Sequence, residues 1–452
     1  MSLPDVLRRA LVTDPPEVSA PDLPALTAAG LAGEVRSRLP EDHPLRGALR
    51  GGHLALGARH AAIRAELRPL LAAWAREGLG AVLFKGFALA EFVYDTPGER
   101  FYGDVDVLLP EDPAVLTRAV HVALALGWRS DGFHALPERW THEAAHLYSP
   151  SGAVRLDVHR RVVAGDPALT RPLTRAVWAA SRPHDWAGIP VRQLAPADAL
   201  IVGLALHRLW GDLGRLKPAD YADARRLLAL FGGDVAALDA RARELGVAAT
   251  WAAFREGCWP PEGRLRLGEA PAGLRAALRR DGLRPRRALW QARLTLLRRR
   301  ARWLPRLLPD ALAALLAVRA GGDPRRPLAR WTPAAPAPVR LPLGTLEDVV
   351  GAAAWLTRLL YPRSWRGACV PRAYATYRAL RRRGHPVVFI SGVARGGGGV
   401  HGHAWVEDDR GGFDAFGEPL NRLRFQEVFR FPAGPEPWAS APPAPAPARP
   451  PA

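Results

Sequence analysis

The residues between positions 367 and 417 include a cysteine, histidines and an aspartate in an order that suits nucleophilic catalysis. Cys369 lies at the start of a predicted helix, because Pro371 suits a first helical turn and apolar residues then recur at helical spacing. A helix N-terminus stabilises the thiolate, which is the nucleophilic form of cysteine. His403 and Asp414 follow on neighbouring predicted strands, where an imidazole can act as base and a carboxylate can orient it. We therefore interpret Cys369, His403 and Asp414 as a candidate catalytic triad.

These residues by themselves leave two alternatives open. Cys369 could be a buried structural cysteine with an unrelated histidine nearby, because local signatures of cysteine enzymes do not transfer between families. His401 has the same strand parity as His403 and could be the base instead. In the catalytic interpretation, backbone N–H groups beside Cys369 are the expected donors to an oxyanion.

The stretches CVPRAYATYRALRRRGHPVVFISGV and HGHAWVEDDRGGFDAF resemble the leader peptidase of lasso-peptide biosynthesis, the transglutaminase-like cysteine protease half of the B maturation protein. The resemblance covers about the last fifth of the chain. It assigns the roles of nucleophile, base and orienting carboxylate to Cys369, His403 and Asp414. It implies a hydrolase that needs no cofactor and removes the leader from a ribosomally synthesised precursor peptide. It also implies two partners, a separate small leader-recognition protein and an ATP-dependent lasso cyclase.

The elements that must position these residues are a helix followed by short strands. The helix from Cys369 is predicted to end at Gly384, with arginines in its last turn. Strands are predicted at 386–393 and 403–407, and a third over 413–416 pairs back as a hairpin. A preceding helix over 346–360 is expected to pack under the first. We therefore predict a C-terminal α+β domain, and the resemblance implies that it is of the papain/transglutaminase-like type.

A second set of acidic residues lies in the N-terminal half. Asp104 and Asp106 share one face of a predicted strand over 104–109, and Asp157 lies on the second strand of a predicted hairpin. Three carboxylates on neighbouring strands suit a pair of Mg²⁺ ions in nucleotidyl transfer. The alternative is that these residues are solvated strand ends, where D-x-D pairs are common.

The segments FKGFALAEFVYDTPGERFYGDVDVLLP and RLDVHRR, with Gly-Trp at 127–128 between them, resemble the uncharacterised nucleotidyltransferase family of the polymerase-β-like superfamily. The resemblance assigns metal binding to Asp104, Asp106 and Asp157. It assigns contact with the triphosphate to Lys85 and Gly86, which stand where the superfamily usually has Gly-Ser. It implies Mg²⁺ and a nucleoside triphosphate as cofactors, with ATP expected. His159 completes a D-x-H motif to which we assign no role.

Lys85 is informative for a separate reason. The chain carries 63 lysines and arginines together, of which only Lys85 and Lys217 are lysines. A lysine supplies a compact point charge where arginine supplies a planar fork. Its retention at position 85, beside Gly86 at a predicted strand-to-helix turn, indicates that a point charge is needed there.

We predict an α+β protein with two catalytic domains. Residues 1–320 form a nucleotidyltransferase-like α/β domain, with a core of about 50–260 and a helical C-terminal part. Residues 321–344 are a Pro-rich linker. Residues 345–431 form the peptidase domain, and 432–452 a disordered tail.

Composition narrows the function classes. The positive charge behind the net value of +19 comes almost entirely from arginine, in a chain rich in Ala, Pro and Gly. We interpret this as a compositional bias of the source genome, so we do not expect nucleic acid as a partner. The arginine cluster over 275–306 is interpreted as a solvated helix face, with an anionic peptide or nucleotide as the alternative ligand. Two distant cysteines, the absence of a signal-peptide pattern and the absence of a membrane span lead us to expect a cytoplasmic protein.

Three functions remain at this point. The first is a bifunctional fusion of leader peptidase and nucleotidyltransferase that matures a ribosomal peptide. The second is a nucleotidyltransferase, of a toxin–antitoxin type or acting on a small acceptor, whose C-terminal domain only binds peptide. The third is an interaction protein with two degenerate sites, against which the intact Cys, His and Asp argue. The precursor peptide and the acceptor are not specified by these patterns.

Overall fold

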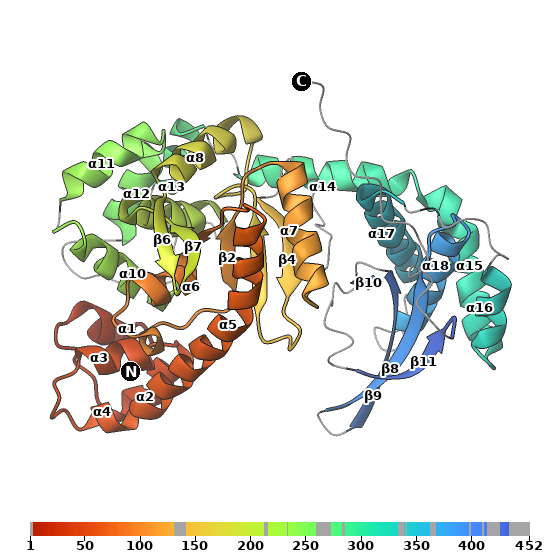
Figure 1. Cartoon of the computed structure of the whole chain (residues 1–452), viewed down its shortest axis with the longest axis horizontal. Coiled ribbons are helices and arrows are strands. Elements are labelled where there is room, and N and C mark those ends of the chain that lie inside the picture. Colours follow the sequence, from red (N-terminus) through yellow and green to blue (C-terminus); the bar gives the residue numbers. More distant parts are fainter. Residues whose placement is uncertain are drawn as a thin grey trace. The chain divides into compact units, whose positions relative to one another are not determined.

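The structure is a computed structural model of the chain. It describes residues 3–130, 142–211, 216–232, 234–258, 273–282, 285–332, 339, 341–361, 368–396, 399–408, 411–413 and 425–433. The chain divides into two compact units, drawn in Figure 1. The N-terminal unit comprises Met1–Val122, Glu138–Ala144 and Ala153–Trp290, and the C-terminal unit comprises Ala123–Pro137, Ala145–Gly152 and Gln291–Ala452.

The N-terminal unit is mixed α and β. Its helical elements are α1 (Leu3–Val12), η1 (Ala20–Asp22), α2 (Leu23–Ala28), α3 (Ala32–Arg38), α4 (Leu45–Ala48), α5 (Arg50–Arg76), α6 (Lys85–Phe92), η2 (Pro97–Glu99), most of α7 (Pro113–Ala125), α8 (Pro167–Ala180), α9 (Pro196–Asp198), the π-helical η4 (Ala199–Gly211), α10 (Pro218–Ala229), α11 (Val235–Glu244), α12 (Ala248–Cys258) and α13 (Leu274–Arg280). Its strands are β1 (Val82–Phe84), β2 (Val105–Leu108), β5 (Arg155–His159), β6 (Arg182–Trp186) and β7 (Ile189–Gln193). Strand β4 (Glu143–Tyr148) begins in this unit, and its remainder pairs with β3 (Arg129–Ser130).

The strands that lie wholly or partly in the N-terminal unit follow one another in the sheet in the order β4-β5-β2-β1-β7-β6. β2 and β5 are parallel and pair Asp106 with Asp157, while β1 and β2 are antiparallel and pair Phe84 with Asp106. All three residues of β1 are buried, as expected for a central strand covered on both faces. The apolar positions in the second half of α5 recur at helical spacing on one buried face, from Ile63 to Trp74. The predicted α/β domain with a helical extension is thus confirmed.

Asp223 connects α10 to the segment that follows α6. Its carboxylate accepts hydrogen bonds from Arg100 Nε and Nη2, both at 2.7 Å, and from the Tyr94 hydroxyl at 2.7 Å. All three side chains are buried. Burial and the nearby Asp223 carboxylate raise the pKa of Tyr94 well above its ordinary value, so the hydroxyl stays protonated and donates. Asp223 is therefore a structural residue that anchors α10 to the segment between α6 and β2.

We expect Asp223→Asn to destabilise the N-terminal unit by about 3–5 kcal/mol, because it leaves the Arg100 guanidinium buried without its counter-charge. Urea unfolding followed by circular dichroism measures the change. The matched control is Asp95→Asn, since the Asp95 side chain is 84% exposed in its ion pair with Arg226 and should contribute under about 1 kcal/mol. Equal effects of the two substitutions would contradict the structural role of Asp223.

The C-terminal unit is also α+β. Its main elements are α14 (Pro285–Ala301, from Gln291 onward), α15 (Leu304–Ala320), α16 (Arg325–Trp331), α17 (Leu343–Leu360), α18 (Cys369–Arg381), β8 (Val388–Gly396), β9 (Gly399–Asp408), β10 (Gly411–Phe413) and β11 (Gln426–Phe431). The strands form an antiparallel sheet of order β10-β9-β8-β11. One face packs on α18 through Phe389, Ala404 and Val406, and the other buries Ile390 and Trp405. Figure 1 shows α17 and α18 beside this sheet. The predicted α+β class is confirmed. Of the third predicted strand, 413–416, only Phe413 lies among the described residues, and β11 was not predicted.

The domain boundary that we predicted at residue 320 differs from the structure. The long C-terminal segment of this unit begins at Gln291, within α14, and α15 shares its core with α17 and α18 through Leu307, Ala311 and Ala314. Buried Asp310 on α15 also pairs with Arg378 and with Arg382, the latter at 3.1 Å. An amphipathic helix does not reveal which core its apolar face joins, and this contact spans many residues of sequence.

The predicted linker over 321–344 also differs from the structure. Residues 325–331 form helix α16, with Leu328 fully buried. Trp331 packs edge-on against Tyr374 of α18, with ring centroids 5.5 Å apart. The proline content of this segment concealed a helix of two turns, whose apolar contacts are made with α18 and not within the segment.

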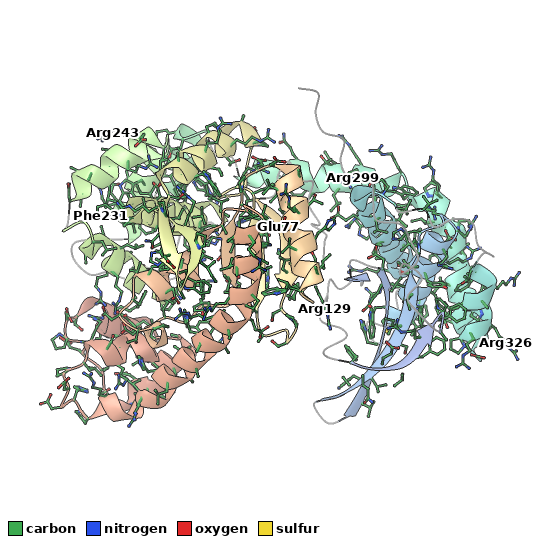
Figure 2. The ribbon with its side chains drawn as sticks, in the orientation of Figure 1. Glu77, Arg129, Phe231, Arg243, Arg299 and Arg326 are labelled. Atoms are coloured by element: carbon green, nitrogen blue, oxygen red, sulfur yellow. The ribbon has the colours of Figure 1, made fainter. Side chains whose placement is uncertain are left out.

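The arginine cluster of α14 packs within its own unit. Arg299 Nε lies 3.0 Å from Asp348 Oδ2, and the Arg300 guanidinium lies 5.3 Å from the Trp355 ring centroid. Gly351 provides the space, since a Cβ there would lie 2.3 Å from Arg300 Nε. Other arginines, such as Arg243 on α11, are exposed, as Figure 2 shows. Arg299 and Arg300 thus pack within the unit, whereas we predicted that the cluster forms a solvated helix face.

None of the helices in the described part of the chain is long and apolar enough to cross a membrane.

Candidate active sites

Cys369 is the first residue of α18 and is half-buried. Pro371 lies in the first turn, where the lack of an N–H costs nothing. The helix ends as predicted: Gly384 has a φ of +76°, and the His385 N–H reaches back to the Leu380 carbonyl at 3.1 Å. Local sequence thus places the thiol at the positive end of a helix dipole.

His403 hydrogen-bonds the Cys369 thiol. Burial by itself raises the pKa of Cys369, but the hydrogen bond to His403 and those from the backbone of Ala404 and Val370 outweigh it. The pKa of Cys369 therefore lies below its ordinary value. A lowered pKa increases the thiolate fraction near neutral pH, which is what a cysteine nucleophile requires. The structure thus joins two of the three predicted triad residues.

Aromatic packing orients the His403 ring. It stacks on Trp405 and Phe425, at centroid distances of 5.9 and 5.1 Å. Across the sheet lies Gly392, where a Cβ would come within 2.9 Å of Phe425 Cβ. His401 lies two residues nearer the hairpin end and is exposed. His403 is therefore the histidine in contact with Cys369.

The third predicted triad residue, Asp414, lies outside the described residues. The two acidic residues at the end of β9 have other partners. Glu407 accepts from Trp405 Nε1 at 2.7 Å, and Asp408 lies 3.1 Å from His385 Nε2. Because His385 Nδ1 accepts from the Leu341 N–H, its Nε2 carries the proton and donates to Asp408. Both residues of this pair are fully buried, so it ties the end of β9 to the segment after α18. Sequence analysis did not single it out.

We expect Cys369 to react with iodoacetamide about tenfold faster than an ordinary thiol at pH 7, because its lowered pKa leaves more thiolate at that pH. Brief labelling followed by peptide mapping compares it with Cys258. Raising the pH should increase the labelling of Cys369 less steeply than that of a thiol of ordinary pKa. In His403→Ala the advantage should shrink, and equal labelling of both cysteines would exclude an activated thiol.

The N-terminal site begins at the turn from β1 into α6. Lys85 has a φ of +58°, a left-handed conformation that costs an L-residue about 1–2 kcal/mol. The next residue must be glycine, because a Cβ at Gly86 would lie 2.6 Å from Tyr102 Cβ. The strained backbone directs the Lys85 ammonium to Asp106 Oδ1, at 2.8 Å. Strain that persists at a charged residue is typical of functional sites.

The predicted carboxylates lie on and beside two parallel strands. Asp106 on β2 and Asp157 on β5 are register partners, and both are buried. Asp104 lies just before β2 and is half-buried. The carboxylate of Asp157 is held by Arg155 Nε and Nη2, at 2.8 and 3.0 Å. Arg155 is 44% exposed, so it can move aside for another cation. The structure thus brings Lys85, Asp106 and Asp157 together.

The carboxyl group of Asp106 has a strongly lowered pKa. Burial alone would raise its pKa, but the Lys85 ammonium and the hydrogen bond from His159 outweigh it and hold the pKa of Asp106 well below its usual range. The His159 Nε2–Asp106 Oδ1 distance is 2.9 Å. Asp106 is therefore ionised at all physiological pH values, as a ligand for a hard cation must be.

Sequence analysis missed three residues around this site. His142 and Glu143 have ligand atoms within 4.8 Å of His159, and Glu143 reaches equally close to Asp157. His207 on η4 is the third; burial lowers its pKa well below the ordinary value, with Lys85 and Arg208 acting in the same direction. The pattern HEAAH at 142–146 could have indicated a metal site, because H-E-x-x-H binds a metal ion when it lies on a helix. Here Glu143 begins a strand, so the helical spacing of that motif does not apply.

We expect Lys85→Gly and Lys85→Ala to lose Mg²⁺-dependent nucleotide binding alike, by at least about tenfold, because both remove the ammonium. They should differ in stability: the glycine variant should be about 1 kcal/mol more stable, because only glycine relieves the left-handed backbone. Calorimetric titration and urea unfolding measure the two effects. A variant of either kind that retained full nucleotide affinity would show that the ammonium has no role in binding.

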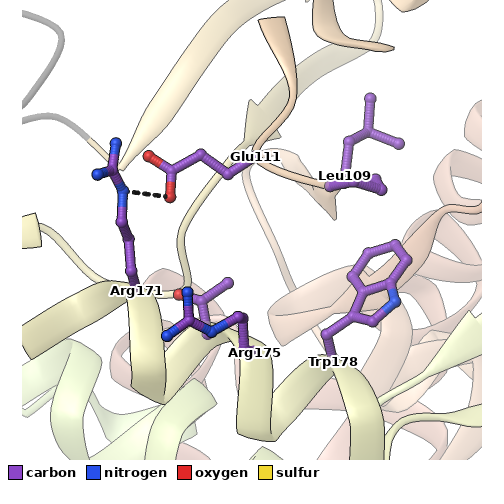
Figure 3. A pocket seen from close by; sticks show the side chains of 7 residues that line it. Leu109, Glu111, Arg171, Arg175 and Trp178 are labelled. Atoms are coloured by element: carbon purple, nitrogen blue, oxygen red, sulfur yellow. Dashed lines mark hydrogen bonds and ion pairs between the residues drawn. The ribbon is translucent and has the colours of Figure 1, made fainter. Parts of the chain in front are cut away.

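Two hollows adjoin the N-terminal sheet. One of about 120 Å³ borders Lys85 and is lined by Phe84, Leu89 and Phe92, among others. The second, of about 470 Å³, follows the end of β2 and is shown in Figure 3. There Arg171 Nε lies 3.1 Å from Glu111 Oε2, and Arg161 Nε lies 3.5 Å from Oε1 of the same carboxylate. Of these two hollows, the smaller is the one beside the predicted phosphate-binding lysine.

Comparisons with known proteins agree with this geometry. Residues 25–255 match the family described as uncharacterised nucleotidyltransferase, and residues 283–430 match the transglutaminase-like superfamily. Since the first match spans just over half of the chain, the protein belongs to the uncharacterised nucleotidyltransferase family. Its second domain is transglutaminase-like, and the match begins at residue 283, just before α14.

The chain was also compared with curated proteins and with solved structures. Among curated proteins no sequence matches the chain. One solved structure, the antibiotic-resistance factor ANT(2'')-Ia in solution, is similar at 15% identity and a TM-score of 0.30, covering 43% of this chain and 96% of that one.

Proposed function

We propose that the chain is a bifunctional maturation enzyme of a ribosomally made peptide of the lasso type, in which the transglutaminase-like domain removes the leader. The observation that carries the proposal is the hydrogen bond between His403 and a Cys369 thiol of lowered pKa at a helix start. A domain that only bound peptide would need no such pairing. The resemblance of the surrounding stretches to lasso leader peptidases supplies the substrate class.

The chemistry follows from the arrangement. The Cys369 thiolate attacks the carbonyl carbon of the scissile amide, and backbone N–H groups at the start of α18 stabilise the oxyanion. His403 holds the proton taken from the thiol and donates it to the leaving amine, which departs as the C–N bond breaks. Water, deprotonated by His403, then cleaves the thioester and restores the thiol. We assign orientation of His403 to Asp414.

We propose that the N-terminal domain transfers a nucleotidyl group, with ATP the expected donor. Asp104, Asp106 and Asp157 are the residues that would hold Mg²⁺, since they offer hard oxygen ligands on adjacent strands. Bound there, the ions would neutralise the phosphates and activate the attacking group. Lys85 would hold the phosphates from the first position of α6, where its ammonium already lies 2.8 Å from Asp106 Oδ1.

The test is incubation of the full chain with the precursor peptide, the small leader-recognition protein and Mg-ATP, read by mass spectrometry. Loss of the leader mass supports the peptidase, and addition of a nucleotidyl mass supports transfer. An ATP-dependent cyclase should act only on the trimmed peptide, and the reaction is expected in the cytoplasm. Addition of nucleotide without any cleavage would favour a nucleotidyltransferase with a peptide-binding domain.

A further inference from the structure

We propose that His142, Glu143 and His159 bind a divalent transition-metal ion such as Zn²⁺, beside the Asp104–Asp106–Asp157 carboxylates and independently of nucleotide. The ligand atoms of the three residues all lie within 4.8 Å of one another. His142 Nε2 and Glu143 Oε1 are 3.5 Å apart, which is the spacing of two ligands about 2 Å from one ion at a near-tetrahedral angle.

The decisive residue is His159, whose side chain is fully buried. Its Nε2 lies 2.9 Å from the Asp106 carboxylate, a hydrogen-bond acceptor, so the neutral ring carries its proton on Nε2. Its Nδ1 is buried and has no hydrogen-bond partner among the described residues. A buried nitrogen lone pair without a partner is costly, and a metal ion would satisfy it.

The contact between His159 Nε2 and Asp106 also orients the proposed metal ligand. Histidines that bind metals commonly donate their other ring N–H to a carboxylate, which fixes the tautomer and makes the ligand nitrogen more basic. Asp106 makes this contact with His159. Phe84 further holds the ring edge-on, at a centroid distance of 4.9 Å. The imidazole is thus oriented before any ion binds.

His142 is suited to the second nitrogen ligand. Its ring centroid lies 4.9 Å from that of His159. Its backbone carbonyl accepts hydrogen bonds from Arg160 and Arg161, at 2.8 and 3.2 Å, which keep it next to β5. The two imidazoles are thus held close enough for both to bind one ion.

Two imidazoles and one carboxylate select against Mg²⁺, which prefers oxygen ligands, and favour Zn²⁺ and its transition-metal neighbours. With three protein ligands, a fourth position is left for water or substrate. The inference goes beyond the proposed nucleotidyl transfer, because it requires neither a nucleotide nor the oxygen-only ligand set.

The test is calorimetric titration of the full chain, without a polyhistidine tag, with Zn²⁺ in the absence of nucleotide. We expect one ion per chain in the wild type and a loss of at least about tenfold in affinity for Glu143→Gln and for His142→Gln. The control Glu77→Gln removes an exposed carboxylate at the end of α5 (Figure 2) and should leave the affinity unchanged. Circular dichroism confirms that each variant is folded.

The wild type provides a readout that does not depend on any variant. X-ray absorption of the Zn²⁺-loaded chain should show two imidazole nitrogens in the first shell. Absence of Zn²⁺ binding by folded wild type, a shell of oxygen alone, or equal affinity in Glu143→Gln and Glu77→Gln would each overturn the proposal. Failure of nucleotide binding would leave it untouched.

Discussion

Cys369→Ala is expected to abolish leader removal, with a loss in rate on the order of 10⁴-fold or more, because no other group can form the covalent intermediate. The fold should be unchanged, since one small half-buried side chain is shortened at a helix end. The measurement is a time course of precursor cleavage by mass spectrometry. Cleavage at the normal rate in this variant would disprove the peptidase assignment.

Substitutions of the two histidines refine this expectation. His403→Ala should reduce cleavage nearly as much as Cys369→Ala, because nucleophile and base act as a unit. His401→Ala is the matched control on the same strand and should retain activity, since His403 is the histidine that hydrogen-bonds the Cys369 thiol. Asp414→Asn should be equally or less severe, through loss of histidine orientation. An inactive His401→Ala with an active His403→Ala would reverse the assignment of the base.

Asp104→Asn combined with Asp106→Asn is expected to lower the affinity for Mg²⁺-nucleotide by more than about 100-fold. Mg²⁺ binds weakly to protein carboxylates alone and is completed by substrate phosphates, so metal and nucleotide binding should depend on each other. Calorimetry with ATP, GTP, CTP and UTP, with and without Mg²⁺, measures this. If the folded wild type bound none of the four nucleotides, the N-terminal domain would have a structural role only.

Two comparisons separate loss of the site from loss of the fold. Asp104→Asn alone leaves the Lys85–Asp106–His159 contacts intact and should still weaken binding, whereas Asp95→Asn should have no effect. Leader cleavage in the double variant should be normal, because Cys369 lies in a separate compact unit with its own core. Loss of cleavage would instead show that the two activities are coupled.

The sequence by itself determined the local features of both sites. The start and end of α18 follow from Pro371 in its first turn and Gly384 after its last, and both are properties of neighbouring residues. Strand alternation similarly placed His403 and Trp405 on one face of β9. The adjacency of Asp106 and Asp157 was predicted from two strand patterns, and the parallel register of β2 and β5 brings these residues opposite each other.

Only the tertiary structure decided which distant residues meet. Asp310 pairs with α18 across a long sequence separation, and this contact assigns α15 to the C-terminal unit. His142 reaches His159 because β4 adjoins β5, and the ionised Asp106 then determines which nitrogen of His159 carries the proton. Such contacts depend on the path of the whole chain through space. Helix propensity, strand alternation and turn residues describe neighbours along the chain, so they carry no information about these pairings.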